Sequence, residues 1–165
     1  MTQLNQLTDH VTLMQTADGG RLEDSQRWLA DNVATRADFA DLWPTIKEMV
    51  DSWSEGWPTH LMVFNWDHDH QPERPPMAFS VDGDFFYGLY VQWSDVADDE
   101  KNIRWATEHM RALEPFATGT ALSDENLINR PFPFVADESL RRLDDLRAAW
   151  DPNQLFVSWL GRPQL

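Results

Sequence analysis

The nine residues 85–93, Phe-Phe-Tyr-Gly-Leu-Tyr-Val-Gln-Trp, constrain the fold more than any other stretch of the chain. The run is apolar and aromatic, and it lies between a turn at Asp82-Gly83-Asp84 and a break at Ser94-Asp95. A run of this length and composition predicts one long strand that is covered on both faces. We therefore expect the other elements to pair with this strand or to pack against it.

Three helices are predicted from apolar residues at helical spacing. The first spans 39–53, with Asp41 as its N-cap so that Pro44 falls in the first turn, where a missing N–H is harmless. The second follows residue 96 and ends at Pro115, with an apolar face made of Ile103, Ala106, Met110 and Leu113. The third spans 138–150, capped by Asp137, with these residues directed inward: Leu140, Leu143, Leu146 and Trp150.

Further strands are predicted at 10–16, 60–66, 77–81 and 118–122, and residues 22–35 are interpreted as a connector or an edge strand. A polar, Pro-rich loop separates 60–66 from 77–81, and a glycine turn leads on to 85–93, so the three strands are expected to form an antiparallel meander. The predicted fold class is α+β, an antiparallel sheet of four to five strands with three helices packed on one face. Residues 1–37 are assigned to an N-terminal strand and connector, and 38–165 to the core of the same single domain.

Charge and composition exclude several classes of protein. The 165 residues carry a formal net charge of −15, which argues against nucleic acid or an anionic membrane as a partner. There is no cysteine, so disulfides, thiolate metal sites and a cysteine nucleophile are excluded. No stretch approaches the roughly 20 apolar residues of a membrane span. We therefore expect a soluble, cytoplasmic protein.

If helices cover one face of the sheet, its other face is left bare, and a bare apolar face normally meets a ligand or a partner. Strand alternation places Phe86, Gly88, Tyr90 and Gln92 on one face, which we predict to be the substrate- or partner-facing one. On the neighbouring strand, the matching residues are predicted to be Leu61, Val63 and Asn65. A register error of one residue would invert this assignment.

A few other side chains are candidates for chemistry. Tyr90 and His109 are weak candidates for acid–base catalysis, since strand tyrosines mostly serve packing. Phe132 and Phe134, between prolines, either form a lid over the bare face or pin their own loop, and we favour the second interpretation. His68 and His70 have the spacing of a metal-binding pair, but they enter a Pro-rich loop with no third histidine close in sequence. We favour a solvated loop and no metal.

The last third of the chain resembles the C-terminal part of berberine-bridge-enzyme-like FAD-linked oxidases. The resemblance is carried by Asn102-x-x-Trp105, by Leu113-Glu114-Pro115 with Gly119, by Leu143-x-x-Leu146, and by Trp150-Asp151-Pro152-Asn153-x-x-Phe156. It covers roughly residues 38–159, and Asp-Pro-Asn-x-x-Phe with its preceding helix is its most specific part.

The resemblance implies a substrate domain without the FAD-binding domain, which in that family is a separate and larger N-terminal part. Members commonly read Gly-x-Tyr-x-Asn where this chain reads Gly119-Thr120-Ala121-Leu122-Ser123. Ala121 and Ser123 therefore stand at cofactor-proximal positions, and the family's residues are absent from both. This chain alone is expected to bind no cofactor, and FAD would come through a partner.

Three functions fit these observations. The chain is one subunit of a split flavoprotein, which roofs the flavin and shapes the substrate pocket. Alternatively, it is a flavin-free binding protein, or a cyclase or isomerase, that acts on a hydrophobic small molecule. The third function is that of a homodimeric structural module.

Overall fold

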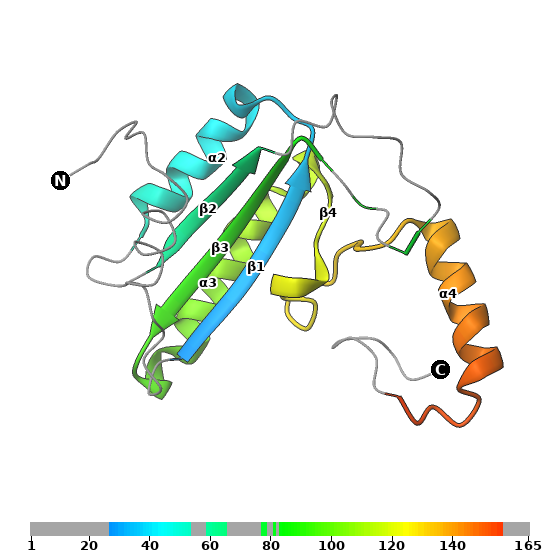
Figure 1. The fold of residues 1–165 in the computed structure, drawn as a ribbon. Coiled ribbons are helices and arrows are strands. Elements are labelled where there is room, and N and C mark those ends of the chain that lie inside the picture. The colour runs from blue at the N-terminus through cyan, green and yellow to red at the C-terminus, as the bar shows by residue number, and fades with distance from the viewer. Residues whose placement is uncertain (1–26, 54–58, 66–76, 79–80, 82, 157–165) are drawn as a thin grey trace, which may run out of the picture.

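The computed structural model describes residues 27–53, 59–65, 77–78, 81 and 83–156. These residues form a four-stranded antiparallel sheet and three α-helices (Figure 1). The predicted α+β class is confirmed. The strand predicted at residues 10–16 lies outside the described residues. In the described part of the chain, no helix is both long and apolar enough to cross a membrane.

The strand order in the sheet is β2-β3-β1-β4. The strands are β1 (Arg27–Thr35), β2 (His60–Asn65), β3 (Phe85–Trp93) and β4 (Ala117–Gly119). The predicted strand at 85–93 is confirmed as β3, and it is a central strand that pairs with both β1 and β2.

The interpretation of residues 22–35 as a connector or an edge strand was wrong. β1 pairs with β3 along nine residues, from Arg27 opposite Trp93 to Thr35 opposite Phe85. Its other edge pairs with β4 only at Ala34 and Thr35. The polar residues Asp31 and Asn32 in the middle of β1 hide its strand pattern, and both are fully buried.

The predicted meander was also wrong. β2 pairs directly with β3, so no strand from residues 77–81 lies between them. Met77, Ala78 and Val81 belong to no strand, and residues 79–80 lie outside the described part of the chain. Val81 is nevertheless buried, and its side chain lies against Gly119 of β4.

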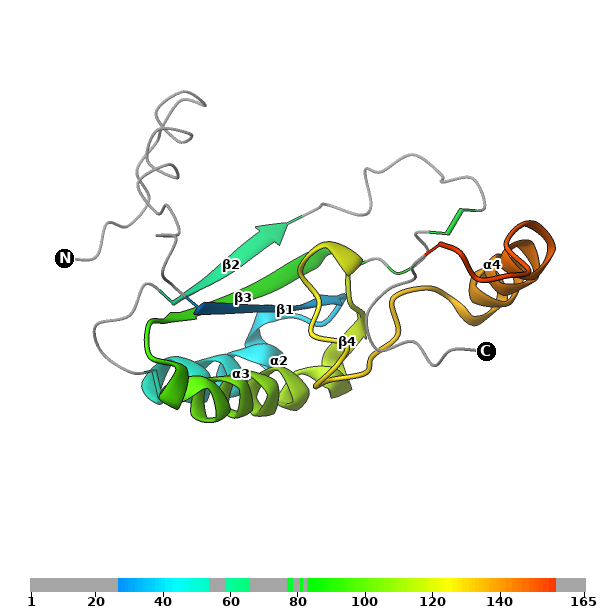
Figure 2. The same cartoon turned by 90° about the horizontal axis from the view of Figure 1, so that it is seen from below.

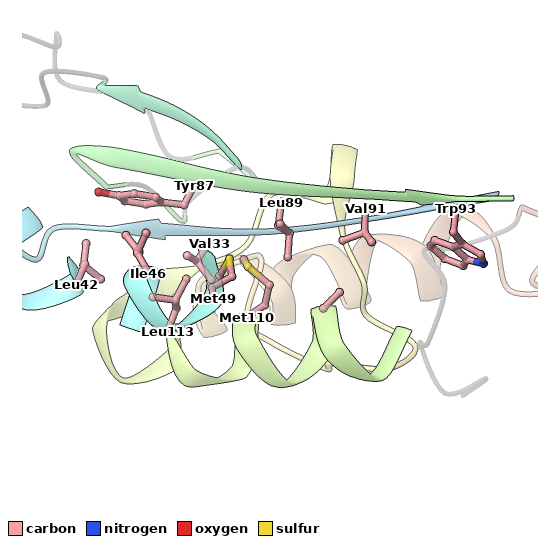
Figure 3. Packing of buried hydrophobic residues seen from close by; sticks show 11 residues of the cluster. Val33, Leu42, Ile46, Met49, Tyr87, Leu89, Val91, Trp93, Met110 and Leu113 are labelled. Atoms are coloured by element: carbon pink, nitrogen blue, oxygen red, sulfur yellow. The ribbon is translucent and has the colours of Figure 1, made fainter. Parts of the chain in front are cut away.

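Two helices, α2 (Phe39–Asp51) and α3 (Asp99–Ala112), cover one face of the sheet (Figure 2). The core between these helices and the sheet is shown in Figure 3. It consists of one residue of β1, alternate residues of β3 and the apolar stripes of the helices: Val33, Leu42, Ile46, Met49, Tyr87, Leu89, Val91, Trp93, Ala106, Met110 and Leu113. The predicted stripe of α3 is thus confirmed. The stripe of α2 is narrower than predicted, since Leu42, Ile46 and Met49 are buried but Phe39, Trp43 and Val50 are exposed.

The predicted N-cap of α2 was wrong by three residues, although the helix begins at Phe39 as expected. Asp38, not Asp41, is the N-cap, and Pro44 therefore lies inside the helix. Pro44 cannot donate the backbone hydrogen bond to the carbonyl of Ala40. The helix is kept by burial of Leu42, Ile46 and Met49.

The third helix, α4 (Asp137–Trp150), forms at the predicted place but with Ala136 as its N-cap. Its apolar residues do not pack inward as expected. No residue of α4 is buried, and Trp150 is 83% exposed. Both views show α4 to the side of the sheet, beyond β4 (Figures 1 and 2).

Three single-turn 3-10 helices complete the described fold: η3 (Val96–Asp98), η4 (Glu114–Phe116) and η5 (Leu122–Asp124).

Candidate functional site

The candidate site lies on the open face, which we define as the side of the sheet opposite α2 and α3. Because Tyr87, Leu89, Val91 and Trp93 point into the helix-covered core, the alternate residues of β3 point to the open face. These are Phe86, Gly88, Tyr90 and Gln92, the alternation predicted from the sequence. Whether they contact a substrate or a partner stays a prediction.

The register of β2 corrects the prediction for that strand. Val63 lies opposite Tyr87, and Asn65 lies opposite Phe85, so both belong to the helix-covered side. The residues of β2 that share the open face are His60, Met62 and Phe64, opposite Tyr90, Gly88 and Phe86. The sequence alone could not fix this register, because the predicted meander placed a strand at residues 77–81 between β2 and β3. The direct pairing of β2 with β3 was therefore not considered.

The open face is only partly exposed. Phe86 and Gln92 are buried, with 5% and 6% of their surface accessible. Trp28 of β1 and Phe64 of β2, by contrast, are 52% and 45% exposed. The exposed apolar surface is therefore concentrated on the two strands that flank β3, whereas β3 itself is largely covered on both faces, as its composition predicts.

Aromatic pairs organise the open face across β2 and β3. The rings of His60 and Tyr90 are stacked, with centroids 4.9 Å apart and an interplanar angle of 15°. Phe64 and Phe86 form a tilted pair at 6.0 Å. Between them, Gly88 leaves room for both rings of β3, since a Cβ there would lie 2.9 Å from Phe86 Cε1 and 3.1 Å from Tyr90 Cε2.

A segment that contains η5 closes over the β1 side of the open face, and Asn32 holds it. The Asn32 amide nitrogen donates to the carbonyls of Ala121 (2.9 Å) and Asp124 (2.8 Å). Its oxygen accepts from Thr120 Oγ1 (2.9 Å) and from the Ala121 N–H (2.7 Å). Both donors and both acceptor positions of the amide are thus used, which fixes the segment on the sheet.

This segment brings a carboxylate to Tyr90. The Tyr90 hydroxyl donates to Asp124 Oδ2 at 3.0 Å, and Ser123 Oγ donates to the same oxygen at 3.3 Å. Burial, followed by the hydrogen bond and the charge of Asp124, raises the pKa of Tyr90 to about 12. Tyr90 is therefore a neutral hydrogen-bond donor at neutral pH and not a base.

On the other side of β1, a buried ion pair holds the continuation of the same loop. Arg130 Nε donates to Asp31 Oδ2 at 2.9 Å, and Arg130 Nη2 donates to Asp31 Oδ1 and, at 2.8 Å, to the Asn32 carbonyl. Arg130 Nη1 also donates to Glu114 Oε1 at 3.3 Å. Asn126 donates to both Asp31 Oδ2 and Thr107 Oγ1, each at 3.1 Å.

Asp31 and Asn32 therefore hold the segment 120–130 by hydrogen bonds and an ion pair made on opposite faces of β1. The segment crosses the edge of the sheet that β4 leaves unpaired, and its open-face end carries Asp124 to Tyr90. Sequence reasoning missed Asp31, Asn32, Asp124 and Arg130. The one signal was an Asp-Asn pair within an otherwise apolar stretch of β1, which is unusual in a buried strand unless the side chains are paired.

The predicted aromatic loop residues lie close to this ion pair. The ring of Phe132 packs against the Arg130 guanidinium, 5.0 Å from centroid to Cζ. The Pro133 carbonyl accepts from the Thr120 N–H at 2.8 Å, which ties the loop to the chain beyond β4. This geometry agrees with a loop pinned by Phe132. The part-buried Phe134 has no assigned role in the site.

His109, the other candidate catalytic residue, is not part of the site. It lies on α3, on the opposite side of the sheet from Tyr90, where its Nε2 is 2.9 Å from Ser52 Oγ and its ring packs on Trp105. Trp105 Nε1 donates to the same Ser52 oxygen at 3.0 Å. Burial lowers the pKa of His109, against the opposing charges of Glu48 and Glu108.

The remaining predicted positions offer little cofactor chemistry. Ala121 contributes its backbone to Asn32, and the Ser123 hydroxyl donates to Asp124. His68 and His70 lie outside the described residues, and in the described ranges no group of three or more His, Asp or Glu side chains has the arrangement of a metal site. None of the open-face residues of β1, β2 and β3 is Lys or Arg. The aromatic rings on this face suit a flat, uncharged ring system, but the strands provide no cation for the diphosphate of FAD.

Comparison with known proteins finds fungal FAD-linked oxidoreductases that are similar to this chain. This chain aligns with FAD-linked oxidoreductase ptmO of Penicillium ochrochloron at 26% identity over 136 residues. The alignment covers 81% of this chain and 29% of that protein. FAD-linked oxidoreductase penO of Penicillium crustosum aligns over the same shares at 24% identity. FAD-linked oxidoreductase nodO of Hypoxylon pulicicidum aligns at 29% identity over 79 residues, 48% of this chain and 18% of that protein.

This chain is related to FAD-linked oxidoreductases. It spans less than a third of the length of these relatives. No family model matches the chain, and no solved structure matches it.

Proposed function

We propose that this chain is a substrate domain of the FAD-linked oxidoreductase type, and that it works as one subunit of a split flavoprotein. A second polypeptide would bind FAD, and the open face would roof the flavin ring and shape the substrate pocket. When bound there, FAD would supply the redox chemistry.

The observation that carries this proposal is the alignment of 136 residues with a region that makes up 29% of two FAD-linked oxidoreductases. The 165 residues have room for a domain of this kind, but not for the remaining length of those relatives. In the proposed arrangement, the FAD-binding function lies outside these 165 residues.

The open face supports the same role. Its exposed side chains, Trp28 and Phe64, flank a central strand on which Tyr90 is held as a neutral donor. Aromatic walls with few, well-placed polar groups are typical of sites for apolar small molecules. A hydrophobic substrate is the expected occupant between this face and the flavin.

The test is native mass spectrometry of the protein purified from its own host, together with a visible absorbance spectrum. The expected result is a complex of this chain with a second polypeptide and FAD. A homogeneous monomer without flavin would overturn the proposal.

One observation favours a second candidate, a flavin-free binding protein, cyclase or isomerase for a hydrophobic small molecule. At the two positions where the resemblance expects Tyr and Asn near the flavin, the small residues Ala121 and Ser123 are engaged within the chain itself. If the purified protein is flavin-free but its melting temperature rises with an apolar ligand, this candidate holds. Light scattering distinguishes this candidate from a homodimeric structural module, which would have twice the mass of the single chain.

A further inference from the structure

The side chain of Asp124 is a carboxylate on the open face of which one oxygen is left over. Oδ2 accepts from the Tyr90 hydroxyl at 3.0 Å and from Ser123 Oγ at 3.3 Å. Oδ1 has no hydrogen-bond partner in the part of the chain that the structure describes. Because the Tyr87 hydroxyl is the only fully buried side-chain polar atom without a partner among these residues, Oδ1 is open to solvent. It is therefore accessible to a ligand.

The position of this carboxylate is fixed before any ligand arrives. The Asn32 side-chain amide donates to the Asp124 carbonyl at 2.8 Å, which holds the backbone. Because Tyr90 keeps its proton, with a pKa of about 12, it stays the donor to Oδ2 and leaves Oδ1 as the open acceptor. A group that is already held in place loses little conformational entropy on binding.

The surroundings of Asp124 supply no cation to neutralise it. Arg130 is the only Lys or Arg in residues 120–130, and its guanidinium is engaged with Asp31 and Glu114 on the other side of β1. None of the open-face residues of β1, β2 and β3 is Lys or Arg. A half-buried carboxylate without a counter-ion favours a cationic ligand. The net charge of −15 attracts cations to the molecule and repels anions.

Aromatic rings lie next to the same carboxylate. The Tyr90 hydroxyl that binds Asp124 lies over Gly88, since a Cβ at that position would be 3.3 Å from the hydroxyl oxygen. The same Cβ would be 2.9 Å from Phe86 Cε1, so the Phe86 ring reaches this point from the other side. The partly exposed ring of Phe64 packs against Phe86. Aromatic faces attract cations, and they also bury the apolar part of a ligand.

We infer that the open face binds an apolar molecule that carries one protonated nitrogen, and that Asp124 is the counter-ion of this nitrogen. The ammonium group donates to Asp124 Oδ1, and the apolar body of the molecule lies against the aromatic side chains of β2 and β3. A charge-assisted hydrogen bond beside aromatic rings distinguishes an amine from a neutral analogue of the same shape. This inference rests on the proposed function, because it names the substrate class of the same site.

The experiment compares two probes of the same shape on the full chain, purified from its own host with any bound partner retained. Naphthylethylamine is protonated at neutral pH, whereas naphthylethanol has the same ring system without the charge. Titration calorimetry measures the dissociation constant of each probe for the wild type, Asp124→Asn and Glu125→Gln. Glu125→Gln is the matched control, because it removes the same charge from the neighbouring residue. Flavin absorbance of each sample reports whether the FAD-binding partner is present.

We expect the wild type to bind the amine at least about tenfold more tightly than the alcohol, as for a charge-assisted hydrogen bond. Asp124→Asn should lose this preference, and Glu125→Gln should keep it. Both variants should unfold at the urea concentration of the wild type, since the oxygen of an asparagine at position 124 can still accept from Tyr90. The comparison of the two probes on the wild type depends on no variant.

The outcomes separate this inference from the proposed function. Equal affinity for the two probes, or binding of neither, would overturn the inference, and flavin in the sample would leave the proposed function standing. A preference for the amine that survives Asp124→Asn, or that falls equally in Glu125→Gln, would also overturn it, because the field of the whole chain would then be the cause. Absence of a flavoprotein would overturn the proposed function, whereas a preference that depends on Asp124 would still assign the amine site to this chain.

Discussion

Asp31 and Arg130 are 99 residues apart in sequence, and they form a bidentate ion pair that is closed to solvent. The carboxylate comes from the middle of β1, and the guanidinium comes from the loop that precedes α4. A buried ion pair of this kind contributes little net stability compared with apolar packing, but breaking it leaves a buried charge without a partner. The pair therefore specifies where the loop must lie.

Replacing Arg130 by Met is expected to destabilise the protein by about 3–5 kcal/mol, because the Asp31 carboxylate then remains buried with only neutral donors, the Asn32 backbone N–H and the Asn126 amide. Urea unfolding measures the loss. The matched control is Arg27→Met, which removes the exposed ion pair between Arg27 and Asp99. That change is expected to cost much less than Arg130→Met, because solvent screens an exposed ion pair. Equal losses in the two variants would contradict the specifying role of the buried pair.

The elements with simple periodicity were predictable, and those held by polar contacts were not. The stripes Leu42-Ile46-Met49 and Ala106-Met110-Leu113 give α2 and α3 directly, because each buries one apolar side. β1 was not predicted as a central strand because Asp31 and Asn32 interrupt its apolar pattern. The hydrogen-bond partners of these two residues are about 90–100 residues away in sequence. Local spacing carries no information about such pairings.

The site was predictable only to the level of strand β3. Alternation gives the side of Tyr90 correctly, since it depends on one strand alone. The side of Val63 was wrong because it depends on a register between two strands. Asp124 was missed because its contact with Tyr90 requires the crossing of the β1 edge, which only the three-dimensional structure shows.

Replacing Asn32 by Ala is expected to release η5 from the open face. The change removes four hydrogen bonds and leaves Thr120 Oγ1 and backbone groups of Ala121 and Asp124 without their partner. The expected loss is about 1–3 kcal/mol by urea unfolding, with faster amide exchange at Ala121. Asn102→Ala, which removes a single bond to the Asp98 carbonyl, is the matched control and should change stability much less.

The ionisation of Tyr90 provides a direct readout of the Asp124 contact. The chain has two tyrosines, and the buried Tyr87 hydroxyl has no hydrogen-bond partner in the described part of the structure, so Tyr87→Phe isolates Tyr90 at little cost. In that background, ultraviolet titration should give a pKa of about 12 for Tyr90. Asp124→Asn should lower this pKa but keep it above 10.0, because burial is its largest cause. No change on Asp124→Asn would rule out the contact.

The raised pKa of Tyr90 is expected to lower the stability of the folded protein at high pH. The pKa of Tyr90 is about 12 in the folded protein and near 10 in the unfolded chain. Between these values the unfolded chain has released the proton and the folded protein has not, so unfolding is favoured as the pH rises. Tyr90→Phe in the Tyr87→Phe background is expected to reduce the loss of urea resistance between about pH 10 and 12. An unchanged loss would mean that Tyr90 does not cause it.

His109 is expected to make the protein less stable in mild acid. Because burial lowers its pKa below 6.5, the unfolded chain takes up the proton first, and stability falls as the pH drops below about 6.5. Protonation also changes the contact between Nε2 and Ser52 Oγ. His109→Gln should reduce the difference in urea midpoint between about pH 7.5 and 5.5. An unchanged difference in this variant would contradict this assignment.

Alanine substitutions at two glycines are expected to have different effects, one on the stability of the sheet and the other on the geometry of the open face. A Cβ at Gly88 would meet the ring edges of Phe86 and Tyr90 at 2.9 and 3.1 Å, and those rings can turn aside. A Cβ at Gly119 would lie 2.3 Å from Val81 Cγ1 and 2.5 Å from the Pro133 carbonyl oxygen, which is fixed backbone. Gly119→Ala should therefore lose more stability, towards the upper end of about 1–3 kcal/mol, and Gly88→Ala less. Gly88→Ala should instead shift the Tyr90 pKa, because the Tyr90 ring is one of the two that have to move. If Gly119→Ala shifted the Tyr90 pKa and Gly88→Ala did not, the open face would be organised from β4 rather than from the aromatic pairs of β2 and β3.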